Sequence, residues 1–254
     1  MRVIALSGKG GTGKTTLAVL IMRWLHYNRS KSILAVDADP ASNLGDMLGL
    51  APGATVGAVR EELRSNAEGL PGGMTKQQFL EYKIRTGLVE SKDFDLIAMG
   101  RPEGPGCYCY ANSLLRDIMD SLSKEYTYIV IDNEAGMEHI SRRTTRDVDH
   151  LFIVSNPTVT SVRTAGKIAR LADDLAVGTR EKHLVINRAA ETLPEQVSTA
   201  IREEGLTEFC SLPEDDMLSS LDRTGEPIWR VAAECKAYAA LAPVLEKLLP
   251  RVQI

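Results

Sequence analysis

The run from Gly8 to Thr15 has the residue types and the spacing of a phosphate-binding loop. Its letters, GKGGTGKT, fit the pattern G-x-x-x-x-G-K-[ST], directly after an apolar strand-like stretch and before an amphipathic helix-like one. Glycines let backbone N–H groups turn inward around phosphate oxygens, and a helix that begins near Lys14 points its positive end at the anion. The pattern predicts that Lys14 reaches the β- and γ-phosphates of a nucleotide and that the Thr15 hydroxyl ligates Mg²⁺. The other loop residues expected to bind the nucleotide are Gly10, Gly11, Thr12, Gly13 and Thr16.

Two acidic segments follow apolar, strand-like stretches downstream of this loop. The first, AVDADPASN, carries Asp37 and Asp39, and the second, IDNEAG, carries Asp132. In open α/β sheets, ligands bind at the carboxyl ends of the strands, which is where these carboxylates fall. A single Asp at such a place is often only a turn former or a helix cap. Two such segments downstream of a phosphate loop instead favour a role at the phosphates.

A cysteine pair, Cys107 and Cys109, lies in a Gly- and Pro-rich stretch, EGPGCYCYAN. Core cysteines usually lie inside apolar strands or helices, as we expect for Cys210 and Cys235, but this pair does not. Two thiolates cannot complete a tetrahedral Zn²⁺ site, whereas a two-fold dimer brings two pairs together as four sulfur donors. Such a set suits Zn²⁺, square-planar Ni²⁺ or an iron–sulfur cluster. The alternatives are two unliganded thiols, or a strained disulfide that a reducing compartment disfavours.

The residues KGGTGKTT, from Lys9 to Thr16, resemble the deviant Walker A signature of the MinD/Mrp/nitrogenase-iron-protein ATPases. The resemblance implies a SIMIBI-type, MinD-like P-loop NTPase fold and a homodimer that hydrolyses ATP to ADP and phosphate. In that family the early lysine, here Lys9, reaches across a nucleotide-sandwich dimer to the partner's phosphates. The expected catalytic residues are therefore Lys9, Lys14 and Asp39.

The same resemblance implies a role for each acidic segment. The segment with Asp37 and Asp39 is similar to the family's switch I, DxDP, in which Asp39 would orient or activate the attacking water and Asp37 would lie near Mg²⁺. The segment with Asp132 is similar to the family's switch II, in which this carboxylate would hold Mg²⁺ through water. Gly136 would let the latter segment swing as the γ-phosphate comes and goes.

Two short segments resemble the family's base-binding loops. In VINRA, Asn187 followed by the basic Arg188 would hold adenine, and in LPEDD, Pro213 and Glu214 would flank the purine. A strand-end Asn that only forms a turn is the alternative. No guanine-binding NKxD sequence follows Asn187, which favours ATP over GTP.

The C-x-C pair together with DNEAGMEH, from Asp132 to His139, is similar to one branch, the CooC-type nickel-insertion ATPases. The similarity spans the chain in motif order. It implies an ATP-dependent metallochaperone that dimerises on nucleotide and metal binding and assists nickel insertion into its client, carbon monoxide dehydrogenase. Cys107 and Cys109 would then share Zn²⁺ or Ni²⁺ across the dimer. The chain lacks the CPxC motif of the cluster-scaffold ATPases and the widely spaced cysteines of the nitrogenase iron protein.

Short apolar runs alternate with longer amphipathic segments along the chain. Runs that are apolar on both faces are typical of parallel strands, and apolar residues at helical spacing predict helices. The expected strands are 3–6, 32–36, 94–99, 128–131, 151–155 and 183–186, and the expected helices are 15–28, 113–124, 159–175 and 228–249. The alternation predicts an α/β fold with a doubly wound, mostly parallel sheet flanked by helices. We expect one P-loop ATPase domain, 1–254, with a helical insertion around 52–90 made of two pieces, 55–66 and 75–86.

Composition limits the classes of function. The chain has 254 residues, of which 44% are hydrophobic and 25% charged, four cysteines and a formal net charge of −4. These values exclude a disordered, collagen-like or disulfide-dense chain, and the acidic balance argues against a nucleic-acid partner. No apolar run approaches the length of a membrane span, and the N-terminal run is too short for a signal peptide. We therefore expect a cytoplasmic protein with no membrane partner.

Two rival functions remain at this point. A positioning ATPase of the MinD/ParA type would need an amphipathic membrane-binding tail or a basic surface, and it leaves the C-x-C pair unexplained. An iron–sulfur cluster carrier ATPase would use the pair, and a bound cluster would colour the purified protein brown.

Overall fold

The structure, a computed structural model, describes residues 1–29, 32–51, 53–65, 73–100, 122, 125–135, 148–174, 178–230 and 235–250. The cysteine pair Cys107 and Cys109, Gly136 and the helix expected over 113–124, apart from Leu122, lie outside these residues. The candidate nucleotide-binding residues all lie within them.

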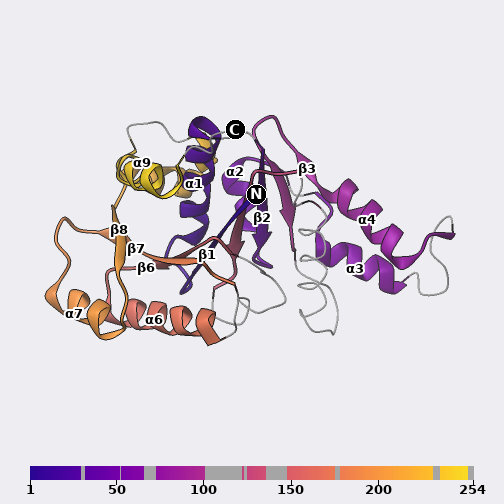
Figure 1. Ribbon diagram of the computed structural model, residues 1–254. Helices are drawn as coiled ribbons and strands as arrows, with labels where there is room; N and C mark the ends of the chain where they lie inside the picture. Colours follow the sequence, from indigo (N-terminus) through magenta and orange to yellow (C-terminus); the bar gives the residue numbers. More distant parts are fainter. Residues whose placement is uncertain are drawn as a thin grey trace.

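One twisted sheet forms the centre of the described part of the chain (Figure 1). Its eight strands, in spatial order, are β3 (Val89–Glu90), β4 (Asp95–Ala98), β2 (Ile33–Ala38), β5 (Tyr128–Asn133), β1 (Arg2–Gly8), β6 (His150–Ser155), β7 (Glu181–Ala189) and β8 (Glu208–Pro213). Neighbouring strands are parallel, except that β3 runs antiparallel to β4 at one edge. This arrangement confirms the predicted doubly wound, mostly parallel sheet.

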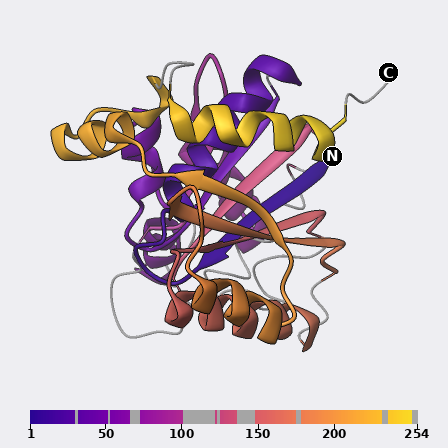
Figure 2. The ribbon, with the colours of Figure 1, turned by 90° about the vertical axis from the view of Figure 1, so that its left-hand side faces the viewer.

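Helices cover both faces of the sheet (Figures 1 and 2). On one face lie α1 (Lys14–Asn28) and α9 (Lys236–Leu248), and on the other lie α6 (Val159–Asp174) and α7 (Glu195–Glu203). Shorter helices follow β2 and β8, namely α2 (Asn43–Leu48) and α8 (Asp216–Thr224). The pair α3 (Val56–Ser65) and α4 (Lys76–Gly87) lies to one side of the sheet, on the side of β2 and β3.

The burial pattern of the strands explains why the sheet is covered twice. Along β1, Val3 and Ala5 belong to the apolar cluster that includes α6 and α7, whereas Ile4 and Leu6 belong to the cluster that includes α1 and α9. Side chains alternate between the two faces of a strand, so a run that is apolar at every position must be buried on both sides. The two apolar clusters fix the sheet between its helices, and the sheet in turn supports the loops that follow its strands.

The sequence located most of these elements. The six expected strands are present as β1, β2, β4, β5, β6 and β7, and the helices expected over 15–28 and 159–175 are α1 and α6. The insertion contains α3 and α4, although its end forms strand β3. Cys210 and Cys235 are buried, as expected for core cysteines.

That the whole chain is one domain stays a prediction. No helix within the described ranges combines the length and the apolar character that crossing a membrane requires.

The helix expected over 228–249 is wrong in its first part. A 3₁₀ turn, Ile228–Arg230, precedes α9, which begins only at Lys236. Cys235 has an extended backbone (φ −60°, ψ 116°), so no helix passes through it. The sequence also left β8, α2, α7 and α8 unassigned. β8 is an edge strand that alternates buried with exposed or half-exposed residues, and it therefore lacks a continuous apolar run.

One buried carboxylate joins the helices that follow β8. Asp215 Oδ1 accepts hydrogen bonds from the backbone N–H groups of Met217 and Leu218 at the start of α8. Its Oδ2 accepts one from the backbone N–H of Ala237, in the first turn of α9, and one from the Cys235 thiol. Burial opposes ionisation, but these four donors outweigh it and lower the pKa of Asp215. One side chain thus caps two helices that lie twenty residues apart.

We expect Asp215→Ala to lower the free energy of unfolding by about 2–3 kcal/mol, because it removes two caps of about 1 kcal/mol each and leaves buried donors unpaired. Asp216→Ala is the matched control, since Asp216 is exposed and lies one position further along. Urea unfolding at pH 7 measures both. The pKa of Asp215 is lowered in the folded state, so this contribution is fully present at pH 7 and is lost only as pH falls through the folded pKa. Equal losses in the two variants would contradict the double cap.

Candidate nucleotide-binding site

A cavity of about 520 Å³ opens at the carboxyl ends of the parallel strands. The loop after β1, the segment after β2, the end of β7 and the residues after β8 all contribute to its wall. The volume is in the range of small-molecule sites. Of the residues that the sequence proposed, the wall contains Gly10, Gly11, Gly13, Lys14, Thr15, Thr16, Asp39, Asn187, Arg188, Pro213 and Glu214. Lys9, Thr12, Asp37 and Asp132 are not part of this wall.

The loop between β1 and α1 has the backbone that a phosphate cradle requires. Gly11 and Gly13 adopt left-handed conformations, with φ of 74° and 91°. A Cβ atom at Gly13 would also collide with the side-chain amide of Asn187. Gly13 is the N-cap of α1, a helix of 15 residues, and no side chain caps the start of this helix. The first backbone N–H groups of α1 are therefore available to a ligand at the loop.

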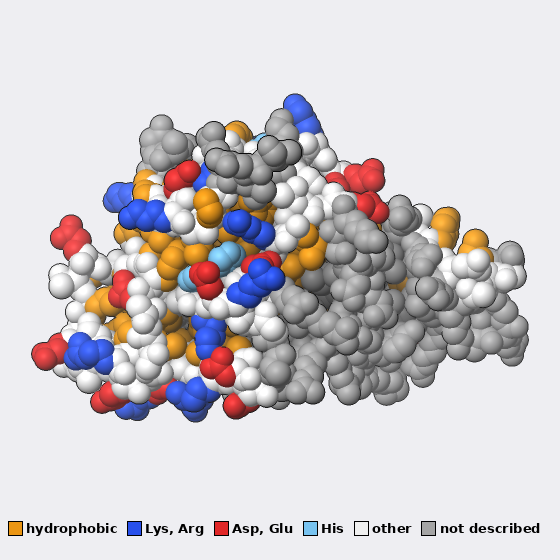
Figure 3. Space-filling view, viewed as in Figure 1, with side chains coloured by type: hydrophobic (Ala, Val, Ile, Leu, Met, Phe, Trp, Pro, Cys, Tyr) orange, Lys and Arg blue, Asp and Glu red, His pale blue; other side chains and the backbone are white. Residues whose placement is uncertain are grey.

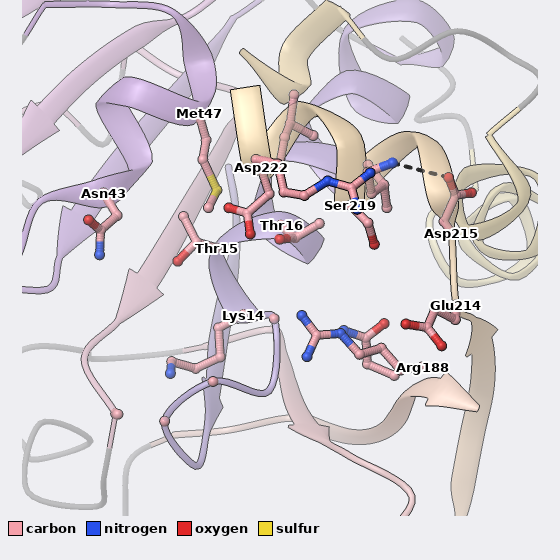
Figure 4. Close-up of a pocket in the computed structure, with 18 of the residues that line it drawn as sticks. Lys14, Thr15, Thr16, Asn43, Met47, Arg188, Glu214, Asp215, Ser219 and Asp222 are labelled. Carbon is pink, nitrogen blue, oxygen red and sulfur yellow. Dashed lines mark hydrogen bonds between the residues drawn. The ribbon is translucent and has the colours of Figure 1, made fainter. Parts of the chain in front are cut away.

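Two hydrogen bonds fix the shape of this loop. The Thr12 hydroxyl donates to the carbonyl of Lys9 over 2.8 Å and closes the loop on itself. The Asn187 side-chain N–H donates to the carbonyl of Thr12 over 2.9 Å and ties the loop to β7. Asn187 therefore holds the loop in position, a role that the sequence pattern around this residue did not indicate. The adjacent Arg188 has a positive φ of 55° at a β-bulge in β7. Figure 4 shows its guanidinium extending into the cavity between Lys14 and Glu214.

The two lysines of the loop differ in their surroundings. Lys14 is buried, and burial lowers its pKa although the negative charges of Asp132, Asp39 and Glu134 oppose that shift. Lys9 is exposed near the tip of the loop. Lys14 is therefore placed to act on a ligand of its own chain, whereas Lys9 does not line the cavity.

Two buried carboxylates lie side by side in the sheet, and one of them, Asp132, interacts with Lys14. Asp37 on β2 and Asp132 on β5 are register partners on neighbouring strands, and both are almost completely buried. Burial is the largest cause that raises the pKa of Asp37 to about 7 and that of Asp132 to about 6. The charge of Asp132 adds to the shift of Asp37, while a hydrogen bond from Thr15 and the charge of Lys14 act against the shift of Asp132.

Hydrogen bonds place these carboxylates differently. Asp37 Oδ2 accepts from the backbone N–H of Leu44 over 2.9 Å, and its Oδ1 accepts from the N–H of Asp39 over 3.2 Å. Asp37 therefore fixes the segment between β2 and α2. Asp39, whose Oδ1 accepts from the N–H of Ala41, faces the cavity. Asp132 Oδ1 is buried and has no hydrogen-bond partner among the described residues.

The donor set at this point fits a hard divalent cation. Mg²⁺ prefers oxygen ligands in proteins. Thr15 supplies a hydroxyl and Asp132 a carboxylate, and the two groups are hydrogen-bonded to each other. A cation would also offset the repulsion between the two carboxylates. Thr15, Asp132 and Asp37 are therefore chemically suited to the Mg²⁺ role expected from the sequence.

The sequence motifs did not indicate the wall of the cavity that faces the loop. Figure 4 shows Asn43 and Met47 on α2, and Ser219 and Asp222 on α8, arranged around the space above Lys14. The remaining members of this wall are Ala135, Asp215, Leu218, Arg223 and Ile228. A signal for α8 was present, because two aspartates ahead of an amphipathic run are typical of a helix N-terminus. Nothing in the sequence indicated that α8 packs near the loop after β1.

Comparison with known proteins agrees with this arrangement. The family described as the CobQ/CobB/MinD/ParA nucleotide binding domain matches residues 3–228. An uncharacterized ATP-binding protein of Methanocaldococcus jannaschii is 41% identical over 249 residues, which cover 97% of this chain and 98% of that protein. The carbon monoxide dehydrogenase accessory protein CooC of Rhodospirillum rubrum is 29% identical over 263 residues, 97% of each chain.

Among solved structures, the MinD cell division protein of Aquifex aeolicus has the same fold. The TM-score is 0.70 at 23% identity, with 99% of this chain and 98% of that chain covered. With a matching family over nearly nine tenths of the chain and a relative that matches over almost its whole length, the chain belongs to the CobQ/CobB/MinD/ParA family of nucleotide-binding P-loop ATPases.

Proposed function

We propose that the cavity binds ATP with Mg²⁺ and hydrolyses it to ADP and phosphate. The observation that carries this proposal is the placement of Lys14, a buried cation at the start of α1, where it interacts with the buried carboxylate of Asp132, the register partner of the equally buried Asp37. A lysine in such a place is suited to the charge of transferring phosphates, and the oxygen donors beside it are suited to Mg²⁺.

Each residue then has a specific task. The N–H groups of the loop and of the first turn of α1 bind the phosphates, and Lys14 stabilises the charge that develops on the transferred phosphoryl group. Thr15, Asp132 and Asp37 hold Mg²⁺, which when bound neutralises phosphate charge. Asp39 orients the attacking water from the cavity wall. Asn187, Arg188, Pro213 and Glu214 surround the adenine end, and Asn187 also holds the loop through Thr12.

We further infer that two chains close on each other with nucleotide between them. Lys9 supports this inference, because it is exposed in the loop and does not line the cavity of its own chain. If a partner chain faced the same edge of the sheet, Lys9 would place its positive charge next to the phosphates of the nucleotide bound to that partner. Hydrolysis would then depend on the homodimer.

The finer proposal concerns the client. Carbon monoxide dehydrogenase, with nickel as cargo, is suggested by the similarity to the CooC protein over 97% of both chains and by the pair Cys107 and Cys109. Two such pairs at a dimer axis would give four thiolates, a set that suits Zn²⁺ or Ni²⁺. Nucleotide state and metal binding would then be coupled, because both ligands favour the same dimer.

A positioning role of the MinD/ParA type is the second candidate, because a MinD protein has this fold and MinD proteins are also similar in sequence. That role does not explain a C-x-C pair. An iron–sulfur carrier is the third. Purification without oxygen followed by metal analysis separates these possibilities, since a cluster gives brown protein with iron and sulfide, whereas a Zn²⁺ site is colourless.

Lys14→Ala is expected to reduce the rate of ATP hydrolysis by at least about 100-fold, the size of effect seen when one group that stabilises transition-state charge is removed. Asp39→Ala should keep most of the affinity for nucleotide and still stop turnover, because Asp39 acts on the water. Phosphate release measures the rate, and equilibrium dialysis with labelled ATP measures binding. Hydrolysis at the wild-type rate by Lys14→Ala would rule out the assignment.

Lys9→Ala should bind nucleotide with unchanged affinity but lose ATP-driven dimerisation. The physical reason is that an exposed lysine acts on the partner's phosphates and not on its own. Sedimentation velocity with a non-hydrolysable ATP analogue measures the dimer. Lys92→Ala, which removes a lysine in the loop that precedes β4, is the matched control and should dimerise normally. The trans role of Lys9 is wrong if both variants dimerise alike.

Cys107→Ala and Cys109→Ala should each abolish thiolate-bound metal, while Cys210→Ala, which alters a buried core cysteine, should leave it unchanged. Titration of Ni²⁺ into reduced protein, followed by thiolate-to-metal charge-transfer absorption, counts only ions that sulfur binds. We expect one such ion per two chains, because each chain supplies two of four donors. One thiolate-bound ion per chain in a monomer would contradict a shared site.

A further inference from the structure

A second cluster of potential ligands lies at the opposite edge of the sheet from the nucleotide cavity. His150 is the first residue of β6, and Glu181 and His183 are the first and third residues of β7. His150 and Glu181 are register partners, and residues two apart on a strand share a face, so all three side chains emerge on the same face. Asn187, at the cavity, lies four residues further along β7 than His183, which corresponds to about 13 Å.

The three ligand atoms form a compact triangle. His150 Nδ1 and His183 Nε2 are 3.1 Å apart, and Glu181 Oε2 lies 3.8 Å from the first and 3.6 Å from the second. A point at equal distance from all three atoms is about 2.0 Å from each, which is the length of a Zn–N or Zn–O bond. The side chains are thus already spaced as the ligands of one ion.

The surroundings hold the two imidazoles in this geometry. The ring of His183 packs against Phe152 and Phe209, with centroids 5.0 and 4.6 Å away. Both histidines are 7% exposed, and burial lowers the pKa of each. Next to them, Asp149 accepts the N–H of Val3 and pairs with Arg180. The charged groups Asp149 and Arg180, which lie beside the cluster, are therefore paired with each other.

The cluster remains open on the side of the carboxylate. The Glu181 side chain is 57% exposed, so an ion can enter from solvent and keep water as a further ligand. Figure 3 shows histidine side chains reaching the surface beside an acidic group in the middle of the face, with basic side chains around them. Two imidazoles, one carboxylate and an open position are a donor set that Zn²⁺ uses in proteins.

We propose that His150, Glu181 and His183 form a binding site for a borderline divalent transition-metal ion, of the class of Zn²⁺, Co²⁺ and Ni²⁺. The site lies within one chain and does not depend on the cysteine pair, on dimerisation or on ATP. The competing interpretation of the same geometry is a hydrogen bond between the two imidazoles with no metal.

The test uses the full-length Cys107→Ser/Cys109→Ser protein, so that no thiolate from this pair contributes. After chelation and dialysis, Co²⁺ and Zn²⁺ are titrated, with visible Co²⁺ absorption and calorimetry as readouts. We expect one ion per chain, no thiolate charge-transfer band and a rise in the melting temperature with Zn²⁺, since a ligand that binds only the folded state stabilises it.

Three substitutions in this background locate the site. His183→Phe should abolish binding while preserving the fold, because a phenyl ring suits the place between Phe152 and Phe209. Glu181→Gln keeps the shape and should weaken binding by at least about 10-fold, the loss that even an outer-shell partner causes. His26→Gln is the matched control. His26 is also next to a carboxylate, Asp93, at 3.5 Å, but it belongs to no three-ligand group within the described part of the chain, so binding should be unchanged.

Circular dichroism and a melting curve in chelator show whether each variant is folded. Failure of the protein without the cysteine pair to bind either ion would overturn the site and leave the imidazole hydrogen bond as the explanation. Binding by folded His183→Phe equal to that of the parent would overturn it as well.

Discussion

The carboxyl edge of the sheet depends on one electrostatic constraint, the burial of two carboxylates next to each other. Burial raises the pKa of both Asp37 and Asp132, and the charge of Asp132 adds to the shift of Asp37, so their ionised forms depend on compensating charges and hydrogen bonds. Lys14, the Thr15 hydroxyl and the backbone N–H of Leu44 supply part of that compensation. Lys14 is itself buried, and the negative charges of Asp132, Asp39 and Glu134 offset part of the cost of that burial. These contacts tie the start of α1 to β5 and the segment after β2 to the end of that strand.

The loop that carries Lys14 is also held by β7, a strand that does not neighbour β1 in the sheet. Asn187 on β7 holds the carbonyl of Thr12 and leaves room only for glycine at position 13. Asn187 and Thr12 are 175 positions apart in the sequence. The order of the strands, with β6 between β1 and β7, brings the end of β7 over the loop. The phosphate cradle is consequently a property of the whole sheet and not of the glycine-rich motif alone.

This dependence explains what the sequence could and could not predict. Runs such as Val3–Leu6 are apolar at every position, which is enough to indicate a strand buried on both faces. The loop from Gly8 to Thr15 is equally local, because its chemistry follows from residue types at fixed spacing. β8 has an exposed face and therefore no continuous apolar run, and the cap that Asp215 places on α9 joins residues far apart in the sequence. His150 and Glu181 meet only through strand pairing, so no spacing in the sequence indicated them.

The two edges of the sheet offer different donors, and this difference separates the ligands that each can bind. The carboxyl edge presents carboxylates, a hydroxyl and backbone N–H groups, which suit phosphates and a hard cation. The amino edge of β6 and β7 presents two imidazoles and a single carboxylate, which suit a borderline metal ion. Mg²⁺ competes poorly for imidazole nitrogen, so a protein that handles both kinds of ion gains selectivity by keeping the donor sets apart. A parallel sheet allows this separation, because all its strands begin at one edge and end at the other.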